Sequence, residues 1–220
     1  MSARTAPEFE TQSSPAARPD RAMTALLVTI WIIGVGLALR PLWKYEMTPG
    51  ADNARAEHWP VDSGLVLQGD KPTLILFAHP RCPCTRATME ELARLMANCS
   101  DRLHAEVHFY LPQDANDEWR MSDLWKAVQQ IPGVAIHEDI NGEEASRFGA
   151  ISSGSTFLYS RAGDLVFAGG ITSSRGHAGS NKGRQAIEEY VLNGKVIQSN
   201  SYVFGCPILT SDQNEEGIAY

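Results

Sequence analysis

Two cysteines one residue apart, Cys82 and Cys84, occur where an apolar run gives way to an amphipathic pattern. The run before them, residues 73–78 (TLILFA), is typical of a buried strand, and the apolar spacing over 84–98 predicts a helix. A chain with this pattern has to end a core strand at the start of a helix. There the partial positive charge of the helix N-terminus favours the thiolate, which attacks disulfides and binds metals. The position of the pair therefore predicts redox or metal chemistry ahead of a structural role.

Strands and helices alternate along the chain after this motif. The patterns predict strands over 73–78, 104–111 and 134–138, helices over 84–98, 123–131 and 143–148, a hairpin of 156–159 and 165–168, and a last helix over 182–192. A further short strand is expected over 64–68. Strands that alternate with helices and then end in a hairpin and a helix predict an α/β domain with a central mixed sheet flanked by helices.

An uncharged apolar segment, residues 23–39 (MTALLVTIWIIGVGLAL), precedes this domain. It is long enough, at the short limit, for one membrane-spanning helix, and Trp43 and Tyr45 follow at the place of an interfacial aromatic belt. A cleaved signal peptide and a buried core helix are the alternatives. No small-x-small cleavage site precedes Arg40, which favours a retained single-pass anchor.

Basic residues flank both ends of this segment, so charge alone does not orient it. Disulfide chemistry suits an oxidising compartment. We therefore expect the N-terminal tail in the cytoplasm, the anchor in the inner (cell) membrane and the soluble domain in the periplasm or another extracytoplasmic space.

Composition divides the remainder of the chain. Residues 1–22, rich in Ala, Pro, Ser, Thr and Arg, are expected to form a disordered tail. Residues 40–70 lack a sustained period and are expected to be a linker, and the folded domain spans 71–195. The C-terminal tail, 196–220, carries Cys206 between a glycine and a proline.

Charge and cysteine content narrow the function classes. The formal net charge of −7 and the lack of a basic run argue against nucleic acid as a partner. Four cysteines in 220 residues are too few for a disulfide scaffold. Cys99 falls inside the predicted helix after the motif and is expected to pack in the core.

This order of elements, with paired thiols at the end of the first core strand, resembles the thioredoxin fold over residues 65–195. Beside the thioredoxin motif Trp-Cys-Gly-Pro-Cys-Lys, this chain has PRCPCTR. The resemblance implies that Cys82 is the nucleophile and that Arg86 matches the basic residue after the second cysteine. The second cysteine, Cys84, comes one position early, and Thr85 occupies its usual place.

A second departure concerns the cis-proline that faces the cysteines in thioredoxins. The matching stretch is 153–156 (SGST), with Ser155 where the proline would be; the Sco-type copper assembly proteins also lack this proline. Taken whole, the chain resembles the membrane-anchored, thioredoxin-like RedB group. Three segments carry that resemblance: HPRCPCTR at 79–86, GGITSSRGH at 169–177 and FGCP at 204–207. It implies a redox role and names no substrate.

The first functional hypothesis is an enzyme, a membrane-anchored extracytoplasmic thiol–disulfide oxidoreductase. Cys82 attacks, Cys84 resolves the mixed disulfide as the nearest second thiol, and Cys206 is the other candidate for that role. Arg86 and the helix end support the thiolate, and His79 could lower a thiol pKa or ligate a metal. We expect no bound cofactor, a protein thiol or disulfide as substrate and a protein dithiol as electron donor.

The second hypothesis is a binding module, a Sco-like copper metallochaperone. Cys82 and Cys84, with His177 or Cys206, make a thiolate and imidazole set suited to Cu(I) or Zn(II). A third, weaker hypothesis is a peroxide-reducing member of the fold, which needs a hydroxyl near the reactive cysteine; Thr85 is the candidate for it.

Overall fold

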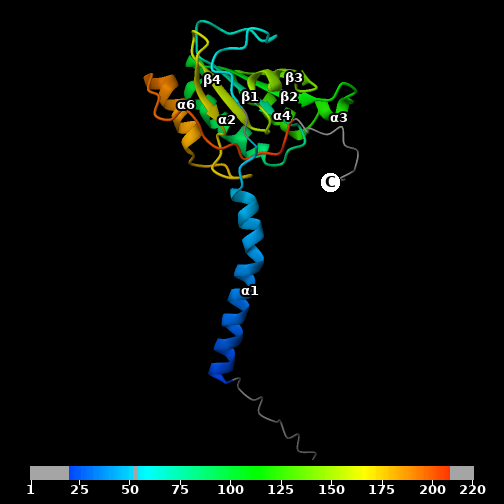
Figure 1. Cartoon of the computed structure of the whole chain (residues 1–220), viewed down its shortest axis with the longest axis vertical. Helices are drawn as coiled ribbons and strands as arrows, with labels where there is room; N and C mark the ends of the chain where they lie inside the picture. Colours follow the sequence, from blue (N-terminus) through cyan, green and yellow to red (C-terminus); the bar gives the residue numbers. More distant parts are fainter. Residues whose placement is uncertain (1–19, 52–53, 209–220) are drawn as a thin grey trace, which may run out of the picture. The chain divides into compact units, whose positions relative to one another are not determined.

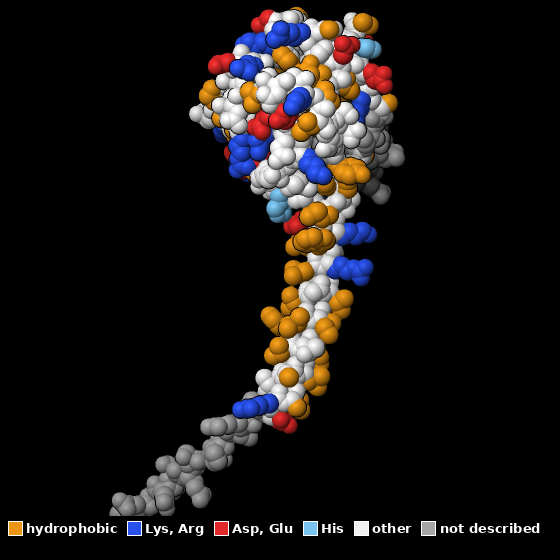
Figure 2. Space-filling model, turned by 90° about the vertical axis from the view of Figure 1, so that its left-hand side faces the viewer, with side chains coloured by type: hydrophobic (Ala, Val, Ile, Leu, Met, Phe, Trp, Pro, Cys, Tyr) orange, Lys and Arg blue, Asp and Glu red, His pale blue; other side chains and the backbone are white. Residues whose placement is uncertain are grey.

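The computed structural model describes residues 20–51 and 54–208. The chain divides into two units, Met1–Leu42 and Trp43–Tyr220. Helix α1 (Arg21–Met47) supplies the described part of the first unit and has no buried residue. Hydrophobic side chains are exposed along its length, as Figure 2 shows. The helix is long and apolar enough to cross a membrane.

A five-stranded mixed sheet forms the centre of the second unit (Figure 1). Its strands are β1 (Thr73–Ala78), β2 (His104–Leu111), β3 (Val134–Ile140), β4 (Ser155–Tyr159) and β5 (Leu165–Gly169). They lie in the order β3-β2-β1-β4-β5, with β1, β2 and β3 parallel and β4 and β5 antiparallel to their neighbours. Every residue of the central strand β1 is buried, which fits its unbroken apolar sequence.

Helices cover both faces of this sheet. They are α2 (Thr85–Cys99), α3 (Asp117–Arg120), α4 (Asp123–Gln129), α5 (Glu143–Phe148) and α6 (Lys182–Asn193), with a 3₁₀ turn at Ser100–Arg102. Helices α2, α4 and α6 pack in one apolar core with Leu74 and Leu76 of β1. Helix α5 packs in a second core with Ile75 and Phe77, on the other face of the same strand. The carboxyl end of β1 thus leads into the cysteine motif from the middle of a two-sided core.

The fold class predicted from the sequence is confirmed, and the predicted strands and helices of the domain are present with small shifts at their ends. Three details differ. Helix α1 continues beyond Leu39 to Met47, α3 and the 3₁₀ turn were not expected, and the described residues 64–68 form no strand. Residues 64–68 form a bend and an irregular segment instead, and the Glu144 carboxylate accepts bonds from the hydroxyl of Ser63 and the N–H of Gly64.

Segments outside the predicted domain also pack on the sheet. Trp59, in the expected linker, makes edge contacts with the rings of Phe148 and Tyr159. On the C-terminal side, Ala168 of β5 donates its N–H to Ser199 O at 2.9 Å, so the described part of the tail covers the edge of β5. The expected disordered tail and the chain end fall mainly on residues 1–19 and 209–220, outside the described residues.

Candidate functional site

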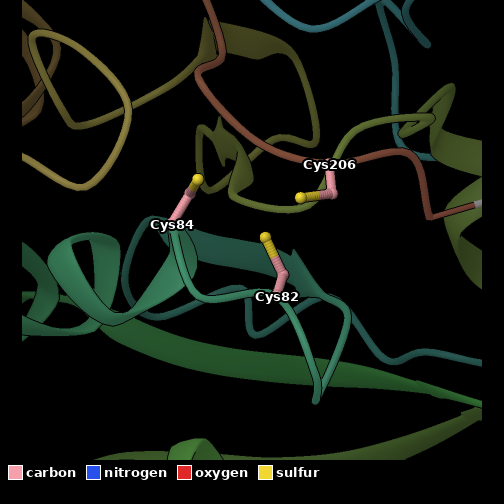
Figure 3. Close-up of side chains that lie close together, drawn as sticks. All are labelled: Cys82, Cys84 and Cys206. Atoms are coloured by element: carbon pink, nitrogen blue, oxygen red, sulfur yellow. The ribbon is translucent and has the colours of Figure 1, made fainter. Parts of the chain in front are cut away.

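Three cysteines meet at the carboxyl end of β1. The sulfur atoms of Cys82, Cys84 and Cys206 all lie within 4.8 Å of one another. Figure 3 shows the three side chains converging from two parts of the chain, the loop between β1 and α2 and the C-terminal segment. Cys82 and Cys84 are buried, Cys206 is half-buried, and all three are free thiols. Both predicted candidates for the resolving residue, Cys84 and Cys206, therefore lie next to the predicted nucleophile, Cys82.

The motif is folded as a turn that runs directly into α2. The N–H of Cys82 donates to His79 O at 3.0 Å, and the N–H of Thr85 donates to Cys82 O at 3.2 Å. Cys84 is the N-cap residue of α2. Pro83 fits here because its missing N–H is not needed at the start of a helix. This local structure places the sulfur of Cys82 at the helix N-terminus, as the sequence predicted.

Cys206 is held beside the motif by contacts of its own backbone. Its carbonyl accepts the N–H of Ser153 at 2.7 Å, and the carbonyl of Gly205 accepts a bond from Arg175 Nη1 at 2.8 Å. A Cβ atom at Gly205 would lie 1.7 Å from Ser153 O, a distance that no side chain tolerates. Only glycine at position 205 therefore lets the C-terminal segment approach the loop before β4 so closely.

A chain of hydroxyl groups leads to the sulfur of Cys82. The N–H of His79 donates to Ser153 Oγ at 2.8 Å, and Ser153 Oγ lies 2.6 Å from Thr85 Oγ1. The Thr85 side chain is hydrogen-bonded to Cys82. Because Thr85 has one hydroxyl proton and donates it to the thiolate, the proton between the two hydroxyls belongs to Ser153. All the donors of this relay then point toward Cys82.

These contacts set the ionisation of the two facing thiols. The hydrogen bond from the Cys206 thiol lowers the pKa of Cys82 most, burial opposes it, and the Thr85 hydroxyl and the N–H groups of Cys206 and Thr85 lower it further. The pKa of Cys82 falls from its ordinary 9.0 to about 4, so Cys82 is a thiolate at neutral pH. The same bond, burial and the charge on Cys82 raise the pKa of Cys206, which keeps its proton.

Two predicted supporting residues are not among the groups that lower the pKa of Cys82 most. The guanidinium of Arg86 is exposed and lies 3.9 Å from Asp123. The ring of His79 accepts the N–H of Arg81 at 3.2 Å and stacks on Tyr110. Burial lowers the pKa of His79, so its ring stays neutral at neutral pH and does not stabilise a thiolate by charge.

The remaining predicted residues, His177, Ser155 and Cys99, are not part of the three-sulfur cluster. His177 is exposed and donates from Nδ1 to Arg175 O at 2.9 Å. Ser155 begins β4 and donates to Ser152 O at 2.7 Å. Cys99 lies in the core, as expected, where burial raises its pKa to about 11.

Sequence reasoning missed Ser153, Arg175 and Gly205. Ser153 lies in the stretch that was compared with the cis-proline loop, and that comparison was the signal that could have placed it opposite the cysteines. Gly205 stands directly before Cys206, where a glycine often marks a close backbone approach. No local pattern marks Arg175, because its role depends on a contact with a segment 30 residues away.

A cysteine thiolate at the end of the central strand of this mixed sheet, followed by a hairpin and a last helix, defines a thioredoxin-like fold. Two solved structures share it: a hypothetical protein of Sinorhizobium meliloti (24% identity, TM-score 0.55, 75% of this chain and 96% of that chain covered) and an uncharacterised conserved protein of Geobacillus kaustophilus (18%, 0.54, 74% and 92%). A secreted disulfide oxidoreductase of Mycobacterium tuberculosis is more distantly similar (16%, 0.40, 57% and 82%). No family model and no curated protein matches the chain. The RedB and Sco resemblances stay predictions.

Proposed function

We propose that this protein is a thiol–disulfide oxidoreductase, anchored to the membrane by α1, with its thioredoxin-like domain on the extracytoplasmic side. The observation that carries the proposal is the sulfur of Cys82, just before α2, within 4.8 Å of the sulfur of Cys206. The lowered pKa of Cys82 and the raised pKa of Cys206 support it. A thiolate and a neighbouring thiol are the two groups that a complete exchange cycle needs. The apolar sequence of α1, which has no buried residue, supports the anchor.

In the proposed reaction, the thiolate of Cys82 attacks a substrate disulfide. One substrate sulfur forms a mixed disulfide with Cys82, and the other leaves as a thiolate that takes the proton of Cys206. The Cys206 thiolate then attacks the sulfur of Cys82, forms a Cys82–Cys206 disulfide and releases the first substrate sulfur. The substrate gains two electrons, and a protein dithiol has to reduce the new disulfide before the next cycle.

Cys206 is the better resolving residue than Cys84, which the sequence alone favoured for its nearness. A disulfide between Cys82 and Cys84 would close a small ring across one residue and would be strained. Cys206 comes from a separate segment and already donates a hydrogen bond to Cys82. The assignment of Cys206 leaves Cys84 without a required role in exchange.

Substrate access to Cys82 depends on the C-terminal segment. Cys82 is only 2% exposed, whereas Cys206 beside it is half-buried. We expect a substrate disulfide to approach over Cys206 and to reach Cys82 when residues 203–207 move aside. The reactive thiolate is thereby shielded from small oxidants while no substrate is bound.

The test is disulfide exchange by the full chain in detergent micelles, with a protein disulfide substrate and a dithiol reductant. Cys82→Ser should abolish exchange, and Cys206→Ser should slow it and accumulate the mixed disulfide on Cys82, detectable by mass spectrometry. Cys84→Ser should retain most of the activity, and Cys99→Ala serves as the matched control for loss of a cysteine outside the site. Exchange that persists in Cys82→Ser would overturn the proposal.

The three-sulfur cluster also favours a second candidate, a copper-binding protein. Three cysteine sulfurs within 4.8 Å of one another fit Cu(I), which prefers soft sulfur ligands and would displace the protons of those that are not ionised. Cys82, Cys84 and Cys206 would hold the ion, and His177 is outside the cluster. Cys84 distinguishes the two functions, because it would be a copper ligand but is not required for exchange. Copper binding is the function if the parent protein shows no exchange activity and keeps bound copper after purification under reducing conditions, and if Cys84→Ser loses that copper.

A further inference from the structure

A second group of ligand-type side chains lies away from the cysteines, on strands β2 and β3. Glu106 and His108 are two residues apart on β2 and therefore point to the same face of the sheet. His137 of β3 is the direct cross-strand partner of His108. These two strands lie side by side (Figure 1). The register of the parallel pair thus brings one carboxylate and two imidazoles together.

The distances within this group fit a metal ion. Glu106 Oε2 lies 3.2 Å from His108 Nε2 and 3.7 Å from His137 Nε2, and all three ligand atoms are within 4.8 Å of one another. Ligand atoms about 2.0–2.2 Å from a tetrahedral zinc ion lie roughly 3.4 Å from each other. Small side-chain adjustments therefore suffice for both imidazoles and the carboxylate to share one ion.

The surroundings hold two of the ligands firmly and leave one side open. His108 is 1% exposed and packs against the ring of Phe77, with ring centroids 5.5 Å apart. The Glu106 side chain is 15% exposed, whereas that of His137, on the edge strand, is 45% exposed. The stacked rings of His108 and His137, 4.8 Å apart, fix their relative orientation. An ion can enter from the His137 side, and solvent can complete its coordination.

We infer that Glu106, His108 and His137 form a binding site for one divalent cation of the zinc class. Two imidazoles with one carboxylate suit Zn²⁺ and similar borderline ions better than the hard cations Mg²⁺ and Ca²⁺. The site is independent of the thiol chemistry. It contains no sulfur, and its residues belong to β2 and β3, whereas the cysteines lie in the loop after β1 and in the C-terminal segment. The alternative is a hydrogen-bonded cluster in which the two histidines share the carboxylate and no ion binds.

Calorimetric titration with Zn²⁺ alone tests the inference. The protein is the full chain in detergent micelles with Cys82→Ser, Cys84→Ser and Cys206→Ser, so that the three-sulfur cluster cannot bind the ion. We expect one saturable equivalent of Zn²⁺. Glu106→Gln or His137→Gln, introduced into this protein, should weaken Zn²⁺ binding. The loss should exceed the roughly 10–100-fold that follows when a residue hydrogen-bonded to a metal ligand is removed, because these residues would be ligands themselves.

The matched control is His104→Gln, on the same strand. His104 also faces a carboxylate, Asp70, at 3.1 Å, but this pair is not part of a three-ligand group. His104→Gln should leave Zn²⁺ affinity unchanged. Absence of saturable binding in the protein with the three serine substitutions would overturn the inference. So would a Zn²⁺ affinity in Glu106→Gln and His137→Gln equal to that of this parent.

Thermal unfolding gives a second readout, the increase in Tm that Zn²⁺ causes. Because this increase is measured against the metal-free Tm of the same variant, it separates metal binding from a general loss of stability. Excess Zn²⁺ should raise the Tm of the protein with the three serine substitutions, since a ligand that binds the native state stabilises it. His137→Gln should keep nearly the same Tm without metal, because this side chain lies at an exposed edge, and should lose the Zn²⁺-dependent increase. A Zn²⁺ effect of the same size in His137→Gln would contradict the site.

Discussion

Two buried anions of this domain are stabilised in opposite ways. The carboxylate of Glu91, on α2, is fully buried and accepts bonds from Arg184 Nε at 2.7 Å, Asn181 Nδ2 at 2.9 Å and the N–H of Gly179 at 2.7 Å, and Arg94 also contacts it. Its charge is therefore neutralised by guanidinium groups. The thiolate of Cys82 is nearly as buried, but the groups that lower its pKa most are neutral donors, the thiol and N–H of Cys206 and the hydroxyl and N–H of Thr85.

This difference separates a structural charge from a reactive one. A buried carboxylate paired with guanidinium groups is held in place, and here it fastens the loop around Gly179 to α2. A thiolate that is held by neutral hydrogen bonds keeps its pKa low and has no ion pair to break before it attacks. Substitutions at the two sites should accordingly change different quantities, the free energy of unfolding at Glu91 and the pKa of Cys82 at the motif.

The largest effect is expected for Glu91→Ala. Removal of the carboxylate breaks its pair with Arg184, whose side chain is only 16% exposed and keeps Glu188 as a partner, and leaves the N–H of Gly179 without its acceptor. Breaking a buried ion pair costs about 3–5 kcal/mol. Urea unfolding followed by tryptophan fluorescence measures the loss. The control is Glu90→Ala, at the exposed neighbouring position, which should change stability by less than about 0.5 kcal/mol. If the two variants unfold at the same urea concentration, the Glu91 cluster does not carry the stability assigned to it.

The next largest effect is expected for Gly205→Ala, and it falls on the thiolate. The new Cβ would clash with Ser153 O, so the C-terminal segment must shift and withdraw both the thiol and the N–H of Cys206 from Cys82. Loss of two hydrogen bonds to a charged group should raise the pKa of Cys82 by about 2 units or more. The pH dependence of iodoacetamide alkylation measures it by mass spectrometry.

Gly69→Ala is the control for this prediction. A Cβ atom at Gly69 would meet no atom within 4 Å, so the substitution should leave the alkylation profile unchanged. Gly205→Ala should also expose Cys82, so that alkylation above its new pKa becomes faster than in the parent protein. An unchanged profile in Gly205→Ala would show that Cys206 does not set the charge of Cys82.

Local elements of the fold and the complete cysteine site differ in how far the sequence predicts them. The strand over 73–78, the helix after it and the hairpin depend on apolar spacing between near neighbours, and these predictions are confirmed. The nearness of Cys82 and Cys84 is likewise local. The place of Cys206 was left open, because it depends on a contact between the chain end and the loop before β4 that no periodicity encodes.

The same reason explains the remaining gaps. The sequence shows Glu106 and His108 at alternate positions, but only the register between β2 and β3 brings His137 beside them. Ser153 became a hydrogen-bond partner of the motif because β4 pairs with β1, with Ser155 opposite Phe77. Side-chain groups that come from distant strands need the register, whereas groups within one turn do not.

A smaller effect is expected for Thr85→Val, which removes one hydroxyl donor and keeps the shape of the side chain. A hydrogen bond to a charged group contributes about 1.5–3 kcal/mol, so the pKa of Cys82 should rise by roughly 1–2 units. In the parent protein, with a Cys82 pKa of about 4, alkylation of Cys82 should be nearly independent of pH above about pH 5. In Thr85→Val the thiolate of Cys82 should become protonated at a higher pH than in the parent protein. On acidification, its alkylation rate should therefore begin to fall at a higher pH.

Thr88→Val is the matched control for this substitution. Thr88 is also buried on α2, but it is not among the groups that set the pKa of Cys82. Its replacement should leave the alkylation profile in place. A Thr85→Val profile that coincides with that of Thr88→Val would remove the Thr85 hydroxyl from the site.

The smallest effect is expected for Ser153→Ala, because Ser153 reaches the thiolate only through Thr85. Loss of the preceding bond in a hydrogen-bonded chain weakens the next one by about 10–30%, which corresponds to about half a pKa unit or less at Cys82. The decisive measurement is the double variant with Thr85→Val. Since the relay is already broken there, adding Ser153→Ala should cause no further rise in the pKa of Cys82, although each single variant causes one. Fully additive shifts would mean that the Ser153 hydroxyl acts on Cys82 by a route other than Thr85, such as its bond with the N–H of His79.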